Sequence, residues 1–113
     1  MQDCIYCKIV RDELPSTRVY EDDEILVFKD IAPQAPTHLL VIPKEHLLTS
    51  AADVTPENSV LVARCFEVIA MLVKRENLTD FRVITNSGKE AGQTVFHLHF
   101  HVLAGVSMKE NLI

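Results

Sequence analysis

Three histidines within five residues give the strongest constraint on how this chain folds. The stretch FHLHFHVL, from Phe96 to Leu103, separates each histidine from the next by one bulky apolar side chain. In an extended strand successive side chains point to opposite faces, so the histidines would share one face and the apolar residues the other. A single histidine in such a strand would simply face water, but three in register indicate chemistry.

The rest of the chain predicts an α+β fold. A short helix is expected at the start, in CIYCKIVRDELP, stopped near Pro15. Strands are expected at residues 17–22, 24–30, 37–43, 81–86 and 96–103. Between the third and the fourth strand lie an ambiguous segment of helical turns and loop, 45–54, and then one long helix. Strands in consecutive runs around a single long helix indicate a mainly antiparallel sheet of about five strands.

The long helix is expected to run from Thr55 to about Asn77. Thr55 supplies a cap hydroxyl, Pro56 suits the first helical position, and Glu57 complements the positive end of the helix. Apolar residues cover most of its circumference, at positions 60–63, 65, 66 and 68–73. Because one sheet cannot bury so wide a surface, we expect a second partner, another copy of the chain.

Composition limits the classes of protein to which the chain can belong. Its 113 residues suffice for one core, so a single domain spanning 1–113 is expected. The net charge is −5 and the basic residues are scattered, which argues against duplex nucleic acid as a partner. No segment resembles a signal peptide or a membrane span, so no membrane association is expected. Three cysteines, an odd number without an export signal, favour a reducing cytoplasm over disulfides.

The histidine cluster offers several kinds of chemistry. Imidazole titrates near neutral pH, so it can act as nucleophile, proton donor or metal ligand. Mutual repulsion disfavours protonation of all three and leaves at least one neutral and nucleophilic at pH 7. Upstream, residues 87–94 predict a flexible polar loop, in which Gly88 and Gly92 would let backbone N–H groups approach phosphate oxygens. A plain hairpin connection explains the loop more simply, although the neighbouring histidines favour the phosphate site.

The motif HLHFHVL, preceded by GQTVF, resembles the signature of the histidine triad (HIT) family, in which an apolar residue follows each histidine. FKDIAPQAPTHLLVIPKEH and CIYCKIVRDELPSTRVYED resemble the corresponding segments of its HinT branch, so the resemblance runs from about Cys4 to Gly105. It implies the HIT-like α+β fold, an antiparallel sheet with one long helix. It also implies a homodimer formed through that helix and adjoining strands, and no organic cofactor.

The resemblance further implies a nucleotide hydrolase. His99 matches the nucleophile, which would attack the α-phosphorus of a purine nucleoside phosphoramidate or a related AMP conjugate and form a nucleotidyl-histidine that water hydrolyses. His101 and His38 match histidines that contact the phosphate. The positions that match nucleotide-binding residues are Asp30 for the ribose, Asn86 and Thr94 at the phosphate, Ile5, Tyr6, Ile9, Phe28 and Ile31 around the purine, and, without a more specific role, Gln93 and Val95. Viewed singly, Ile9, Phe28 and Ile31 are better explained as core residues than as pocket residues, and Asp30 as a turn residue.

Cys4 and Cys7 form a C-x2-C pair, the spacing at which two thiolates can bind one tetrahedral ion. From the spacing alone, both could equally be packed in the N-terminal helix. Some bacterial HIT proteins resemble this chain in having the same pair with the histidine of a Pro-Lys-x-His segment, here His46, and in using the first triad histidine, here His97, as fourth ligand. The resemblance therefore implies a closed, structural zinc site that would pin the N-terminal helix to the sheet and fix the histidine strand.

The chain departs from the family pattern after the motif. Ala104-Gly105-Val106 replaces the Gly-Gly-Arg of many HinT-like chains and the chain contains no Trp, so the preferred leaving group stays open. His101 stands where the uridylyltransferase branch has Gln, which argues against that transferase activity. The classes that remain are a phosphoramidase or dinucleoside polyphosphate hydrolase, a nucleotide-binding regulatory module with little turnover, and a metal-binding protein whose histidines are all ligands.

Overall fold

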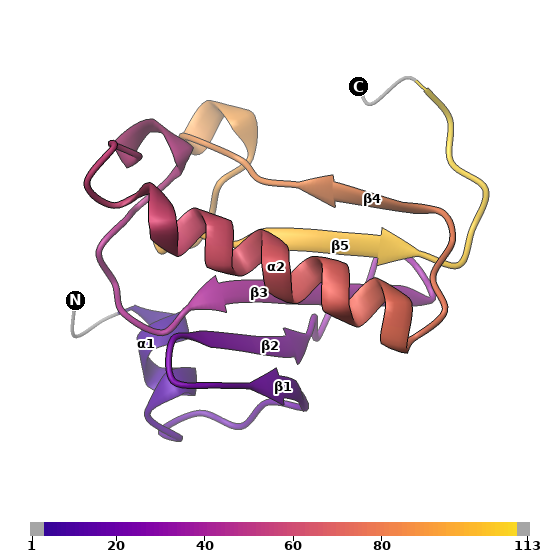
Figure 1. Ribbon diagram of the computed structural model, residues 1–113, viewed down its shortest axis with the longest axis horizontal. Helices are drawn as coiled ribbons and strands as arrows, with labels where there is room; N and C mark the ends of the chain where they lie inside the picture. Colours follow the sequence, from indigo (N-terminus) through magenta and orange to yellow (C-terminus); the bar gives the residue numbers. More distant parts are fainter. Residues whose placement is uncertain (1–3, 111–113) are drawn as a thin grey trace.

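The computed structural model describes residues 4–110. Its helices are α1 (Ile5–Val10) and α2 (Ser59–Arg75), with two 3-10 turns, η1 (Ala51–Asp53) and η2 (Lys89–Ala91), in the connections. The strands are β1 (Arg18–Glu21), β2 (Ile25–Lys29), β3 (Thr37–Pro43), β4 (Phe81–Ile84) and β5 (Phe100–Ala104). Figure 1 shows α2 lying across the sheet and α1 beside the end of the sheet where β3 finishes.

The five strands form one antiparallel sheet in the order β1-β2-β3-β5-β4. This confirms the α+β fold that the sequence predicts, with one long helix and a short N-terminal helix. β5 lies between β3 and β4, so the histidine motif enters the interior of the sheet and is not at its edge. In this ladder His101 lies opposite Leu40 of β3 and Ile84 of β4.

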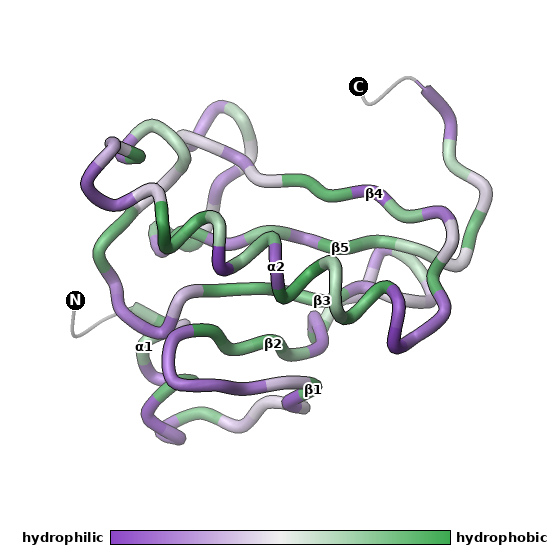
Figure 2. Tube along the Cα trace, viewed as in Figure 1, coloured by the Kyte–Doolittle hydropathy of each residue, from purple (hydrophilic) through white to green (hydrophobic). Residues whose placement is uncertain are grey.

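Strands β2 and β3 are apolar along almost their whole length because both faces of the sheet are covered there. The side chains of these strands that pack with α2 are Ile25, Val27, Leu39 and Val41. Those that pack with Tyr6 and Ile9 of α1 are Leu26, Phe28, Leu40 and Ile42. Figure 2 shows hydrophobic residues concentrated in the central strands and in α2. Since α1 has only 6 residues, it covers only part of the sheet face opposite α2. The rest of that face is left for a site.

Both ends of α2 differ slightly from the prediction. The helix begins at Ser59 because Pro56–Asn58 form a separate turn, in which the Asn58 side chain accepts from the Thr55 N–H at 2.8 Å. Asn58 thus takes the N-cap position expected for Thr55, and its side chain makes no hydrogen bond to an N–H of the helix. The helix ends at Arg75, where Asn77 adopts a left-handed conformation with φ 56° and the Leu78 N–H donates to the Val73 carbonyl at 2.7 Å, a Schellman ending.

The same ending explains why α1 stops well before Pro15, the expected stop. Asp12 is left-handed with φ 61°, and its N–H donates to the Ile9 carbonyl at 3.1 Å. The next N–H, that of Glu13, donates to the Lys8 carbonyl at 2.8 Å. The helix is therefore closed by backbone hydrogen bonds, and proline is not required to end it.

The histidine stretch is a regular strand only from Phe100 onward, so the predicted strand at 96–103 is wrong at its start. The preceding residues leave the ladder because other groups take their hydrogen bonds. The Leu98 N–H donates to the Leu48 carbonyl at 2.9 Å, and the carbonyl of Pro43, the last residue of β3, accepts from the His97 side chain at 2.7 Å. On the other side Thr85 donates its hydroxyl to the His99 carbonyl at 2.7 Å, just after β4 ends.

Helix α2 buries one side and exposes apolar residues on the other. The buried side chains are Leu61, Cys65, Val68, Ile69, Leu72 and Val73. Val60 and Phe66 remain 68% and 46% exposed, as expected if one sheet cannot cover the helix. Neither helix within residues 4–110 has the length and apolarity needed to cross a membrane.

Candidate active site and metal centre

The histidines of the motif lie on the face of the sheet opposite α2. The intervening residues Leu98, Phe100 and Val102 all join the cluster packed under α2, which confirms the predicted alternation. His97 and His99 are 0% and 5% exposed, and His101 is partly exposed. The alternation therefore persists through His97 and His99 even though they precede the regular strand.

Backbone geometry fixes which nitrogen of His99 carries the proton. Its Nδ1 atom lies 2.8 Å from the carbonyl oxygen of His97. A carbonyl can only accept, so Nδ1 must carry a hydrogen and donate it, and in the neutral ring Nε2 keeps its lone pair. Burial lowers the pKa of His99 below its usual range and thus favours this neutral form. Within residues 4–110 no hydrogen bond joins Nε2 of His99 to another protein group, so its lone pair is available to a ligand.

A second chain of hydrogen bonds fixes His38 and His101. The backbone N–H of Gln34 donates to Nδ1 of His38 at 3.0 Å, so neutral His38 must carry its proton on Nε2. That Nε2 lies 2.8 Å from Nδ1 of His101 and 3.4 Å from a carboxylate oxygen of Asp30. His38 therefore donates mainly to His101, and neutral His101 must carry its own proton on Nε2, where it can be donated to a ligand.

The charge state of His101 follows from its surroundings. Burial, followed by the proximity of His99 and His38, lowers the pKa of His101 to about 4. At neutral pH His101 is thus a neutral N–H donor. Together, Nε2 of His99 supplies a lone pair and Nε2 of His101 a hydrogen, and the two rings are 5.1 Å apart between centroids. A phosphate group attacked by His99 could accept this hydrogen through one of its oxygens.

Tyr6 of α1 packs against the proposed nucleophile. Its ring lies edge-on to His99 with centroids 5.0 Å apart at 90°, and it also contacts His97 at 5.9 Å and Phe28 at 5.6 Å. Burial, followed by the charges of Asp30 and Cys4, raises the pKa of Tyr6 to about 12, so the hydroxyl stays protonated. The ring restricts the positions that the His99 side chain can adopt.

The other residues matched to a nucleotide site fall into two groups. Ile9 and Phe28 are buried in the α1 cluster with Val95 packed against it, whereas Ile5 and Ile31 are 49% and 96% exposed. Ile9 and Phe28 thus lie beneath the surface of the site and support it. The exposed side chains of Ile5 and Ile31, with the exposed edges of residues beside them, can contact a ligand directly. Asp30 begins the loop to β3, where one carboxylate oxygen accepts from the Ala32 N–H at 2.8 Å, a turn contact, and the other faces His38.

The loop before the motif is more ordered than a flexible polar loop. Gln93 is 3% exposed, and its amide accepts from the Gly88 N–H at 2.8 Å and donates to the Thr49 and Val95 carbonyls at 2.7 and 3.1 Å. The Gly92 N–H donates to the Lys89 carbonyl at 3.0 Å. The N–H groups of Gly88 and Gly92 are therefore used within the loop and are not aimed at a ligand.

Three positions in and beside this loop remain available to a ligand. Thr94 is exposed, and within residues 4–110 no hydrogen bond joins the N–H of Thr94 or Val95 to another protein group. Asn86 is half-buried two residues beyond Ile84, which faces the same side of the sheet as His101. Gln93 holds this loop in place through its side chain, and the backbone beside it can face an anion.

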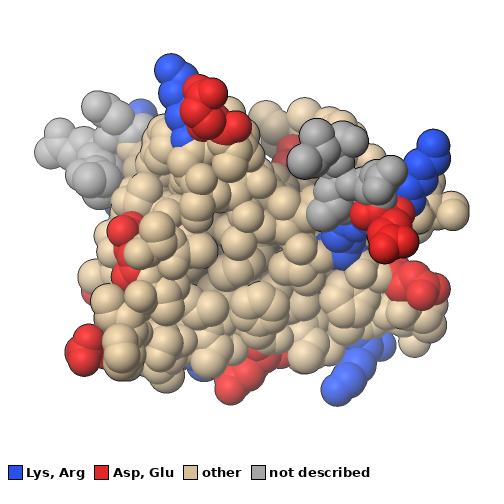
Figure 3. Space-filling model, turned by 90° about the horizontal axis from the view of Figure 1, so that it is seen from above, with Lys and Arg blue, Asp and Glu red and all other residues tan. Residues whose placement is uncertain are grey.

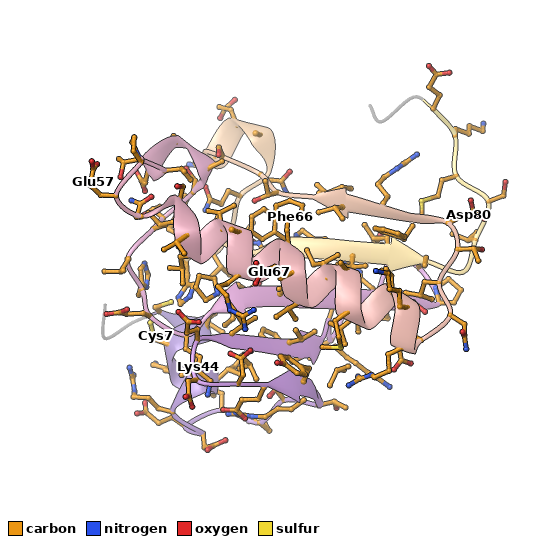
Figure 4. All side chains as sticks on the ribbon, viewed as in Figure 1. Cys7, Lys44, Glu57, Phe66, Glu67 and Asp80 are labelled. Atoms are coloured by element: carbon orange, nitrogen blue, oxygen red, sulfur yellow. The ribbon has the colours of Figure 1, made fainter. Side chains whose placement is uncertain are left out.

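Cys4, Cys7, His46 and His97 bring four donor atoms within 4.8 Å of one another. Nδ1 of His97 lies 3.5 Å from Sγ of Cys4 and 3.6 Å from Sγ of Cys7, and Nδ1 of His46 lies 3.3 Å from Sγ of Cys7. In a tetrahedral zinc site with ordinary bond lengths the sulfur-to-nitrogen separation is about 3.6 Å. The residues present therefore fit a zinc ion. Figure 4 shows Cys7 and Lys44 at the same end of the sheet, where α1 meets β3.

The tautomer of His97 also suits a metal. Its Nε2 lies 2.7 Å from the Pro43 carbonyl, which can only accept, so Nδ1 has a free lone pair directed toward the two sulfurs. A second group of donors, Asp30, His38 and His101, lies equally close together. In this second group the Gln34 N–H occupies the lone pair on Nδ1 of His38, so neutral His38 carries its proton on Nε2. His38 therefore donates a hydrogen bond here and offers no lone pair to a metal.

Sequence patterns did not reveal several groups that organise the site. These are the Gln34 N–H, the carbonyls of Pro43 and Leu48, and the hydroxyl of Thr85. All but the last are backbone groups, which carry no residue-specific signal. The exception, Thr85, lies in the predicted strand 81–86, and nothing in the sequence distinguishes it from an ordinary strand residue.

The chain is similar to known proteins in sequence and in fold. The family model described as "Scavenger mRNA decapping enzyme C-term binding" matches residues 3–112. The chain is 40% identical over 106 residues to a purine nucleoside phosphoramidase of Escherichia coli, covering 92% of this chain and 88% of that protein. It is 42% identical over 106 residues to a 14 kDa zinc-binding protein of Zea mays, covering 92% and 83%. A solved HIT family hydrolase from Clostridium thermocellum superposes with a TM-score of 0.94 at 39% identity, covering 100% of this chain and 99% of that one.

Proposed function

Because the chain belongs to the histidine triad (HIT) family of hydrolases, we propose that it hydrolyses purine nucleoside phosphoramidates or related AMP conjugates at the α-phosphate. The observation that carries the proposal is the contact between Nδ1 of His99 and the His97 carbonyl, which leaves Nε2 as the free nucleophile. The relative named purine nucleoside phosphoramidase supports the choice of substrate class.

In the proposed reaction, Nε2 of His99 attacks the α-phosphorus, and the bond from phosphorus to the amine nitrogen breaks as the new bond forms. The amine takes a proton from solvent and leaves. The positive charge that develops on the His99 ring is stabilised by its Nδ1–H bond to the His97 carbonyl. His101 donates its Nε2 hydrogen to a phosphate oxygen, and water then hydrolyses the nucleotidyl-histidine to release AMP.

The nucleotide would lie on the open face of the sheet. Asp30 would accept hydrogen bonds from the ribose hydroxyls, and Ile5, Tyr6 and Ile31 would contact the purine above the support of Ile9 and Phe28. Asn86, Thr94 and the Val95 N–H would bind the phosphate together with His101. Gln93 would act through the loop that it anchors, because its own amide is fully engaged.

We also propose that Cys4, Cys7, His46 and His97 bind one zinc ion in a closed structural site. Bound zinc would cross-link α1 to the segments that carry His46 and His97. All four ligands come from the protein, so no position remains for a water molecule. The similarity to a zinc-binding protein of Zea mays supports the identity of the metal.

A homodimer is the assembly that we propose, formed through α2 and the edge strand β4. Phe66 and Val60 of α2 remain exposed, and β4 has a free edge. Figure 3, which views the molecule from the β4 side, shows charged side chains mainly around the rim of this surface and few at its centre. An uncharged centre with a charged rim is typical of an interface between protein chains.

A panel of substrates tests the proposed function. Release of AMP should be followed with an adenosine phosphoramidate, an aminoacyl adenylate analogue and diadenosine polyphosphates. We expect the phosphoramidate to be hydrolysed fastest. Preference for the polyphosphates would make the chain a dinucleoside polyphosphate hydrolase, and AMP binding without turnover of any substrate would leave a regulatory module.

A further inference from the structure

We propose that the metal centre controls how the nucleophile is held, so that metal occupancy sets the reactivity of His99 as well as the stability of the chain. The inference rests on the proposed hydrolase function and zinc site and concerns the contacts between them. The ligands come from three segments, around Cys4 and Cys7, around His46, and at His97. Each segment also contacts His99 or the chain on either side of it.

The first connection is His97 itself. Its side chain faces the two sulfurs through Nδ1, and its backbone carbonyl accepts the Nδ1–H of His99 at 2.8 Å. The same residue is therefore a metal ligand and the group that fixes the His99 tautomer. A ligand bond to the His97 ring limits rotation of that residue, and with it the direction of its carbonyl.

The second connection runs through α1. Tyr6 lies between the two cysteines in the sequence and places its ring edge-on against His99, 5.0 Å away between centroids. α1 has 6 residues, too few to be stable alone, so it depends on its contacts with the sheet. Metal bonds to Cys4 and Cys7 would hold α1 against the sheet and keep the Tyr6 ring beside the nucleophile.

The third connection runs through the segment that follows His46. The Leu48 carbonyl accepts from the Leu98 N–H at 2.9 Å, between the metal-binding and the nucleophilic histidine. The neighbouring Thr49 carbonyl accepts from the Gln93 amide at 2.7 Å, and Gln93 anchors the loop that precedes the motif. A metal bond to His46 would thus fix the backbone to which both sides of His99 are attached.

Asp30, His38 and His101, three of the groups matched to the ribose and phosphate, depend less on the metal than His99 does. Asp30, His38 and His101 are held by one another and by the Gln34 N–H, and none of them contacts a metal ligand directly. Loss of the metal should therefore weaken nucleotide binding less than it slows turnover. Because Ile5 and Tyr6 of α1 would contact the purine, we also expect some loss of affinity for AMP when the metal is removed.

The test compares zinc-loaded protein, the same protein after chelation, and chelated protein to which Zn²⁺ is returned. Nitrogen NMR of the His99 ring should show the proton on Nδ1 in the loaded form and a mixture of tautomers without metal. Turnover should fall by about tenfold to 100-fold and recover with Zn²⁺, while the dissociation constant of AMP changes by less than about fivefold. His46→Ala should reproduce the chelated state, and Glu45→Ala, a change at the exposed neighbour outside the centre, should not.

Each outcome decides the proposal. A His99 spectrum and a turnover that are unchanged without metal would overturn it, and so would a chain that unfolds on chelation, because the metal would then act only on folding. Circular dichroism separates these two cases. If even the loaded protein releases no AMP, the proposed hydrolase function fails, while the His99 spectrum still tests the coupling.

Discussion

The carbonyl oxygen of His97 and Nδ1 of His99 lie 2.8 Å apart, and this contact determines what each histidine can do. It requires a hydrogen on Nδ1 of His99 and leaves Nε2 with its lone pair. A similar backbone contact, from the His97 ring to the Pro43 carbonyl at 2.7 Å, leaves the opposite nitrogen, Nδ1, free in His97. Two residues apart, His99 thus has its lone pair on Nε2, the atom that we propose attacks the phosphorus, and His97 has its lone pair on Nδ1, the atom that we propose binds zinc.

Replacing Gln34 with proline removes the N–H that fixes His38 and, through it, His101. Gln34→Pro should lower turnover by about tenfold, since groups that orient reacting residues typically contribute this much. Gln34→Ala keeps the N–H and should behave like the parent chain. Equal activity of the two variants, measured by AMP release, would show that this N–H has no part in catalysis.

Acid stability should depend on His101. Its pKa is lowered to about 4, so as the pH falls below the usual value of 6.5 the unfolded chain binds this proton first. The stability linked to a neutral His101 is therefore present above about pH 6.5 and lost as the pH falls toward 4. Gln at position 101 cannot titrate. Between about pH 6.5 and 4 the free energy of unfolding of His101→Gln, measured with urea, should therefore fall by on the order of 2 kcal/mol less than that of the parent chain. Parallel pH profiles of the two chains would contradict this prediction.

Metal content tests the zinc site. The purified chain should contain about one zinc per chain by elemental analysis, and the double variant Cys4→Ser with Cys7→Ser should contain none. Its melting temperature should fall by roughly 10 °C or more, which corresponds to about 2–3 kcal/mol for a domain of this size. Cys65→Ala, at the buried cysteine outside the centre, should keep the zinc. Metal-free protein of undiminished stability would rule the site out.

Assembly should depend on Phe66. Light scattering at micromolar concentration should give about twice the chain mass of 12.7 kDa. Phe66→Glu should give a monomer, because an unpaired carboxylate would be buried at the interface. Glu57→Lys, a change of charge at an exposed residue before the start of α2, serves as the control and should leave the dimer intact. A parent chain that is monomeric at this concentration would refute the proposed interface.

The sequence predicted the sheet and the face on which the histidines lie, because alternation is a local property of the chain. It could not predict that the regular strand begins only at Phe100, since this depends on Pro43 and Leu48, which are distant in the sequence. The spacing of Cys4 and Cys7 was visible, but from the residues alone packing was an equal explanation. Only folding brings His46 and His97 beside them.

The same limit applies to the groups around the phosphate. Gly88 and Gly92 suggested backbone N–H groups facing a ligand, yet those groups bond within the loop. Gln93 entered as a nucleotide-binding position and proved to have a fully engaged side chain. Such contacts depend on side chains and backbone groups that meet only in three dimensions, and neither propensity nor periodicity encodes them.

The central claim is that Nε2 of His99 forms a covalent bond to the α-phosphorus. Intact-protein mass spectrometry after rapid mixing with an adenosine phosphoramidate tests it most directly, with peptide mapping to locate the modified residue. We predict one added adenylyl group on His99 in the parent chain, which disappears as AMP is released, and none in His99→Ala, which should still bind AMP. Turnover by His99→Ala within about tenfold of the parent chain, or an adduct on another residue, would contradict the account.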